Sequence, residues 1–74
     1  MQQSLLTNAK SIGNDNMTTV HFDGIYKIRR EFIGYTKKEV LSLAKKYGID
    51  HDCYQIYIPD YQLVLTRRGN RWYQ

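Results

Sequence analysis

The chain has 74 residues, a formal net charge of +4, 42% hydrophobic residues and one cysteine, Cys53. This length allows a single domain with a small core, and the apolar content excludes a wholly disordered chain. A lone cysteine excludes an internal disulfide and favours a reducing, cytoplasmic location, and without a long apolar run or signal-peptide pattern we expect no membrane partner.

The N-terminal part is polar and ends in Gly13-Asn14-Asp15-Asn16. This composition predicts a flexible arm over residues 1–16, although Leu5, Ala9 and Ile12 share the spacing of a weak helical segment. Residues 17–74 are then expected to form one small α+β domain.

Two segments rich in β-branched and aromatic residues, 18–22 and 25–32, flank Asp23-Gly24. Asp-Gly between apolar runs is typical of a two-residue type I′ turn, so we predict a hairpin with Phe22 opposite Ile25. The alternation of apolar and polar residues is imperfect, which leaves open that the first strand is short or frayed.

A capping box, Thr36-Lys37-Lys38-Glu39, marks the start of a helix. We predict a helix over 37–47, closed by Gly48 as a left-handed residue, with Lys45 and Lys46 near its negative end. The expected buried stripe consists of Val40, Leu41, Leu43, Ala44 and Tyr47, and the four lysines of this segment are expected to face solvent.

Three further strands, 53–58, 61–67 and 71–73, are predicted with turns at Pro59-Asp60 and Gly69-Asn70. The predicted fold class is α+β, in the order ββαβββ: an antiparallel sheet, made of an N-terminal hairpin and a C-terminal three-stranded meander, packs against one helix. Alternation places one set of residues toward the helix: Tyr54, Ile56, Ile58, Tyr61, Leu63, Leu65 and Trp72. The opposite face is predicted to carry Gln55, Tyr57, Gln62, Val64, Thr66, Arg68, Arg71 and Tyr73.

Catalytic and metal-binding patterns are weak in this sequence. His51 and Cys53 are two residues apart, but a zinc site needs a second pair of ligands, so we interpret Cys53 as a small core residue and residues 50–52 as a turn. The acids are accounted for by turns, the helix cap and ion pairs, and the five glycines form no phosphate loop. We therefore expect no enzyme, no cofactor and no metal.

Basic and aromatic residues form the remaining signal. The candidate binding residues are Lys27, Arg29 and Arg30 on the second strand, with Tyr57, Arg67, Arg68, Arg71 and Tyr73 in the meander. Arginine and lysine neutralise phosphates, and tyrosine stacks on exposed bases. Structural alternatives remain: helix lysines commonly form a solvated face, arginines protect edge strands, and Trp72 can cap the core.

These features predict a small basic, non-enzymatic module that binds nucleic acid, preferably RNA or another single strand, through an arginine- and tyrosine-bearing sheet face. The alternative is a protein-binding regulator or inhibitor that docks on an acidic surface of a larger assembly, since tyrosine and arginine are also enriched in interface hot spots. In this alternative, the strand at 71–73 offers an edge that could pair with a strand of the partner. A homodimer is a further possibility.

Overall fold

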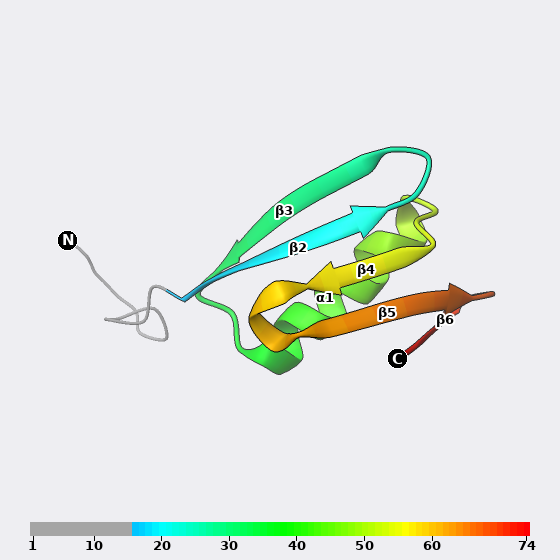
Figure 1. Ribbon diagram of the computed structural model, residues 1–74. Coiled ribbons are helices and arrows are strands. Elements are labelled where there is room, and N and C mark those ends of the chain that lie inside the picture. The colour runs from blue at the N-terminus through cyan, green and yellow to red at the C-terminus, as the bar shows by residue number, and fades with distance from the viewer. Residues whose placement is uncertain (1–15) are drawn as a thin grey trace.

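The computed structural model describes residues 16–74 as a five-stranded antiparallel sheet with one α-helix against one of its faces (Figure 1). The elements in chain order are β2 (Met17–Asp23), β3 (Lys27–Ile33), α1 (Lys37–Asp50), β4 (Gln55–Ile58), the short 3-10 helix η1 (Pro59–Tyr61), β5 (Leu63–Arg68) and β6 (Arg71–Tyr73). The predicted α+β class and the order ββαβββ are confirmed. The expected arm, apart from Asn16, lies outside the described residues.

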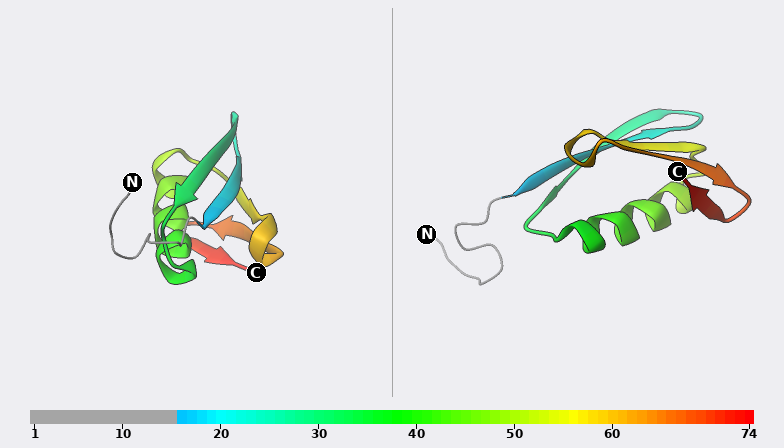
Figure 2. Two further views of the ribbon diagram at one scale, coloured as in Figure 1. Left: turned by 90° about the vertical axis from the view of Figure 1, so that its left-hand side faces the viewer. Right: turned by 60° about the horizontal axis from the view of Figure 1, so that its bottom comes forward.

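The strands lie in the order β3-β2-β4-β5-β6, so the N-terminal hairpin and the C-terminal meander share one sheet. They join where β2 pairs with β4, with His21 opposite Tyr57. Figure 2 shows α1 beneath one face of the sheet and no other described element over the opposite face. Among residues 16–74, no helix combines the length and the apolar character needed to cross a membrane.

The core lies between α1 and the sheet, where apolar side chains from both layers meet. Its buried members are Val20, Phe22, Val40, Ala44, Cys53, Ile56, Ile58 and Leu65. Burial alternates strictly along β2, with Thr18, Val20 and Phe22 buried and their neighbours partly exposed. The first strand is seven residues long and lies between β3 and β4, so it is neither short nor frayed.

The N-terminal hairpin differs from its predicted register. Asp23 pairs with Lys27 and Phe22 with Ile28, so the loop has three residues, Gly24, Ile25 and Tyr26, instead of two. Gly24 is not in a left-handed conformation; instead, a Cβ at this position would lie 3.0 Å from Cys53 Cα. The glycine allows the backbone after α1 to pass against the loop, a tertiary requirement that a local turn signal does not contain.

The helix begins as predicted and continues past its predicted end. Thr36 Oγ1 accepts the Glu39 N–H at 3.2 Å, and a Glu39 carboxylate oxygen accepts the Thr36 N–H at 2.8 Å, so the capping box is present. Gly48 lies inside the helix, which ends at Asp50, and the left-handed residue that follows is Asp52. Lys45 and Lys46 are consequently not in the last turn.

Gly48 is buried beneath the indole of Trp72 from β6. A Cβ at Gly48 would lie 2.6 Å from Trp72 Cζ2, which is closer than atoms pack. The indole Nε1 also donates a hydrogen bond to the Lys45 carbonyl oxygen at 3.1 Å. Trp72 therefore caps the end of the core, as the structural alternative proposed, and glycine provides the space for its ring.

Two details of the meander also differ from prediction. The β4–β5 connection contains η1 and a left-handed Gln62, so Ile58 pairs with Leu63 rather than with Tyr61. The register moves by two residues, which leaves each strand residue on its predicted face. Tyr54 precedes β4 and is 58% exposed instead of belonging to the core face. The two-residue turn at Gly69-Asn70 is confirmed by the pairing of Arg68 with Arg71.

Candidate functional site

The sheet face opposite α1 is open in the described part of the chain, and we call it the outer face (Figure 2). Paired residues of neighbouring strands share a face, so the strand registers place every second residue of each strand on the outer face. Its members are Met17, Thr19, His21, Asp23, Lys27, Arg29, Glu31, Ile33, Gln55, Tyr57, Val64, Thr66, Arg68, Arg71 and Tyr73.

Two tyrosines provide exposed aromatic rings on the outer face. Tyr57 on β4 is 43% exposed and Tyr73 on β6 is 47% exposed. The His21 ring lies beside Tyr57, with ring centroids 5.9 Å apart and planes inclined at 32°. The Arg68 guanidinium lies over the Tyr73 ring, 5.8 Å from its centroid. Each tyrosine therefore has one neighbour that orients its ring and leaves a large part accessible.

Four cations and two carboxylates share this face. Lys27 and Arg29 stand on β3 at one side, and Arg68 and Arg71 flank the last turn at the other. None of these four forms an ion pair within residues 16–74. The carboxylates are Asp23, opposite Lys27, and Glu31, opposite Thr19. The positive charge is thus divided between two sides of a central strip that contains His21 and Tyr57.

Two of the residues predicted for this surface lie on the other face. Arg30 points toward α1, where its guanidinium stacks over the Tyr47 ring at 4.9 Å. Arg67 is directed to the same side and forms a 2.7 Å ion pair with Asp52. The other six predicted residues, Lys27, Arg29, Tyr57, Arg68, Arg71 and Tyr73, are all exposed members of the outer face.

Sequence reasoning missed His21 as a neighbour of this site. The alternation of buried Val20 and Phe22 with His21 would have placed the histidine on the polar face of its strand. Its proximity to Tyr57 depends on the pairing of β2 with β4, which joins segments 36 residues apart. That pairing has no local signal in the sequence.

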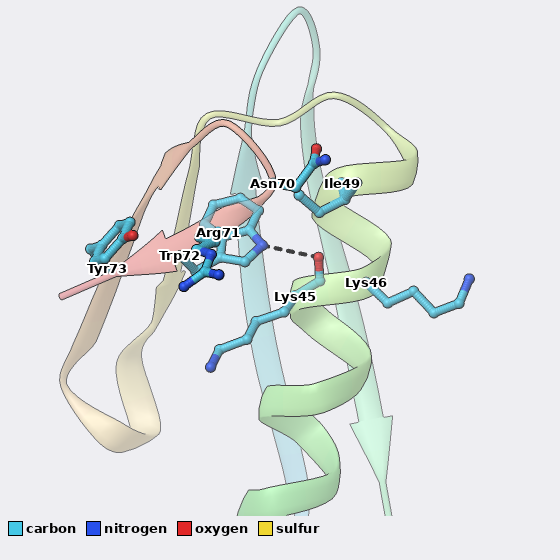
Figure 3. Close-up of a pocket in the computed structure, with 7 residues that line it drawn as sticks. All are labelled: Lys45, Lys46, Ile49, Asn70, Arg71, Trp72 and Tyr73. Carbon is cyan, nitrogen blue, oxygen red and sulfur yellow. Dashed lines mark hydrogen bonds between the residues drawn. The ribbon is translucent and has the colours of Figure 1, made fainter.

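Two hollows border the outer face. One, of about 300 Å³, is lined by His21, Asp23, Lys27, Arg29 and Tyr57, together with residues Phe22 and Ile28. The second, of about 530 Å³, lies between β6 and the C-terminal half of α1 (Figure 3). Figure 3 shows the Trp72 indole against the helix and Tyr73 directed away from it. Arg71 and Tyr73 therefore belong both to the outer face and to the rim of this second hollow.

The His51–Cys53 pair does not form a nucleophile–base arrangement. His51 caps α1 and stacks on Tyr47, with ring centroids 3.9 Å apart, and its Nδ1 lies 3.0 Å from the Tyr47 carbonyl oxygen. Cys53 is buried, and the desolvation caused by burial raises the pKa of its thiol. In the described part of the chain, no three His, Cys, Asp or Glu side chains gather as a metal site would require.

Comparison of the chain with protein-family models, with curated proteins and with solved structures found no match in any of the three.

Proposed function

We propose that this protein is a non-catalytic binding module of the cytoplasm that holds single-stranded nucleic acid on its outer face. The observation that carries the proposal is the open sheet face, where Tyr57 lies between two pairs of cations that form no ion pair within residues 16–74 and Tyr73 lies beside the second pair. Aromatic rings stack on bases of any identity, and lysine and arginine neutralise the phosphates between them.

The spacing of the two rings fits one strand that crosses the sheet. Tyr57 opposes Val64, and Tyr73 opposes Thr66, so the tyrosines are separated by two strand positions across the sheet and two residues along it. Strand spacing and residue rise put their backbones about 12 Å apart. This separation allows each ring to stack on a different base, while Lys27 and Arg29 extend the path past β2.

Single strands are favoured over duplexes because of how the rings are presented. A duplex hides its base faces in the stack, so the exposed rings of Tyr57 and Tyr73 would find only edges and phosphates. An unpaired strand offers both base faces and phosphates to the same surface. The proposal therefore predicts tighter binding to a single strand than to a duplex of equal length.

A fluorescence anisotropy titration with labelled single-stranded and duplex oligonucleotides tests this function. Replacing Tyr57 or Tyr73 by alanine is expected to weaken single-strand binding by about 1–3 kcal/mol, because each loses one stacked base. Tyr26→Ala is the matched control, since Tyr26 is 76% exposed in the β2–β3 loop and off the outer face. Equal losses in all three variants would contradict the proposed site.

The salt dependence supplies a second readout of the same titration. Each phosphate contact with a single strand contributes about −0.7 to the slope of log K against log salt concentration. Four cations therefore predict a slope of up to about −3, and Arg68→Gln should reduce its magnitude by about 0.7. Lys38→Gln, on the exposed surface of α1, should leave the slope unchanged.

An acidic protein surface is the second candidate ligand. The outer face combines the exposed Tyr57, Tyr73 and Val64 with Arg68 and Arg71, and tyrosine and arginine are enriched in protein interfaces. A pull-down from nuclease-treated lysate separates the two functions. One stoichiometric protein that remains bound after nuclease treatment would support this candidate, whereas loss of all bound material would support nucleic acid.

A further inference from the structure

The strand β3 forms a seven-residue edge of the sheet within the described residues. It is the first strand in the sheet order and, among residues 16–74, pairs only with β2. The opposite edge strand, β6, has only three residues. An edge of seven residues presents backbone donors and acceptors that invite another strand, and soluble proteins commonly shorten, cover or charge such edges.

The hydrogen bonding of β2 fixes which backbone groups of β3 point outward. Gly34 N donates to Asn16 O at 3.0 Å, and Tyr54 N donates to Asp23 O at 2.8 Å. Even-numbered residues of β2 are therefore directed toward β3 and odd-numbered residues toward β4. Paired residues share this alternation in an antiparallel ladder, so the N–H and C=O groups of Arg29 and Glu31 point away from the sheet.

The side chains of β3 are complementary to a second copy of the same strand. If two copies pair antiparallel with Arg30 on a two-fold axis, Arg29 faces the partner's Glu31 on the outer face. On the helix side, Ile28 faces the partner's Phe32, which matches two half-buried apolar side chains. The same register places Lys27 opposite the partner's Ile33 and uses all seven residues of the strand.

Neighbouring registers are less complementary. Moving the axis to Arg29 places Lys27 opposite the partner's Glu31, but it also places two Arg29 side chains against each other and Ile28 opposite the partner's Arg30. Moving the axis to Glu31 places two glutamates against each other. With the axis at Arg30, the two Arg30 side chains are the like-charged residues that lie opposite each other. Each of these guanidiniums is drawn toward its own helix by the Tyr47 ring at 4.9 Å, which moves the charge away from the axis.

An apolar margin beneath β3 supports the same arrangement. Leu43 of α1 is 39% exposed and lines a hollow of about 240 Å³ together with Phe32 and Tyr47. A two-fold axis perpendicular to the sheet keeps both helices on one side. The partly exposed apolar side chains of the two copies, Phe32, Leu43 and Tyr47, would then face each other beneath the two paired β3 strands.

We propose that the chain self-associates through β3, with two copies paired antiparallel along Lys27–Ile33 about a two-fold axis at Arg30. The two five-stranded sheets become one continuous sheet, and their outer faces become one surface. This proposal does not rest on nucleic-acid binding, because it concerns the free protein.

Sedimentation equilibrium of the full chain without nucleic acid tests the association, over about 5 to 500 µM. The average molar mass is expected to rise with protein concentration, from the mass of one chain to that of two. Glu31→Arg is expected to weaken association about tenfold or more, because the symmetry turns both cross-strand ion pairs into like-charge pairs. The double variant Arg29→Glu with Glu31→Arg is expected to restore it, and circular dichroism verifies that each variant is folded.

Cysteine substitution tests the register. The Cα atoms of a residue on the axis would lie about 4.5 Å apart in a pair without hydrogen bonds, within the range that a disulfide spans. Arg30→Cys is therefore expected to give a disulfide-linked dimer on oxidation. Arg29→Cys is the matched control, because its two Cα atoms would be about 8 Å apart. Cys53 is 1% exposed and does not compete.

The self-association proposal is overturned if the wild-type mass stays at one chain throughout, or if Glu31→Arg leaves the dimer unchanged. Equal disulfide formation by Arg30→Cys and Arg29→Cys would overturn the register.

Discussion

The packing of Trp72 on Gly48 fixes the contact between the helix and the last strand. The indole rests on the glycine and is held by a hydrogen bond to Lys45, so the ring has little freedom to move. The side of α1 that carries Gly48 and Lys45 is thereby tied to β6, whose flanking residues Arg71 and Tyr73 belong to the outer face. The packing of Trp72 thus positions part of the candidate site.

Gly48→Ala is expected to destabilise the protein by about 1–2 kcal/mol. Alanine normally stabilises a helix interior by about 0.5–1 kcal/mol relative to glycine, but here the new methyl group would overlap the indole, and overpacking costs about 1–3 kcal/mol. Urea unfolding measures the change. In a Trp72→Ala background the overlap with the indole is absent and only an approach of 3.2 Å to Ile56 Cδ1 is left, so Gly48→Ala should cost less stability or become stabilising. A gain in the wild-type background would refute this explanation.

Cys53 predicts a loss of stability at high pH. Burial raises the pKa of the folded thiol above its unfolded value, so the folded state keeps its proton while the unfolded thiol ionises. The free energy of unfolding is then unaffected below the ordinary thiol pKa, about 8.5, and falls as the pH rises toward the raised value. The urea midpoint should fall more between about pH 8 and about pH 10 in the wild type than in Cys53→Ala. Identical slopes would mean that the thiol does not contribute.

At the residue scale, alternation along a strand predicted part of the candidate site correctly. It placed Tyr57, Arg68, Arg71 and Tyr73 together because their strands are consecutive and joined by short connections. The prediction grouped Arg30 with its neighbours by sequence alone, whereas consecutive strand residues point to opposite faces. Arg67 and Arg68 are likewise consecutive strand residues that point to opposite faces. Arg67 forms an ion pair with Asp52 beside the helix.

Elements whose boundaries depend on local chemistry were predicted well. The capping box defines the start of α1, and the turn at Gly69-Asn70 defines the last hairpin. The helix end and the first hairpin loop depend on tertiary contacts instead. Gly48 lies inside the helix beneath Trp72, where a larger side chain would overlap the indole, and Gly24 serves a close approach to Cys53. The local sequence predicted a helix end at Gly48 and a two-residue turn at Gly24, and tertiary packing gives both glycines a different role.

Thr36→Ala tests the element that the sequence defined most clearly. Removing the hydroxyl leaves the Glu39 N–H without its acceptor, and losing such a cap typically costs about 1 kcal/mol. Thermal or urea unfolding should show this loss. Ser42→Ala, at an exposed position in the middle of α1, should be neutral or slightly stabilising because alanine favours helix. Comparable losses in both variants would argue against a specific role for the cap.

At the scale of the whole molecule, a single helix covers one sheet face and leaves the other accessible. The amino-acid pattern predicted both layers and one sheet made of the hairpin and the meander, but it did not predict that the two halves would join through the pairing of β2 with β4. That junction brings His21 to Tyr57 and adds Lys27 and Arg29 to a surface otherwise built by the meander. The candidate site is therefore a property of the assembled sheet rather than of any one segment.

The most direct test of the outer face is a backbone amide NMR titration of the full chain with a short single-stranded oligonucleotide. We expect the largest chemical-shift changes at His21, Tyr57, Thr66 and Tyr73, with little change at Lys38 and Ser42 on the exposed surface of α1. Changes concentrated on the helix, or no changes at low salt, would contradict this expectation.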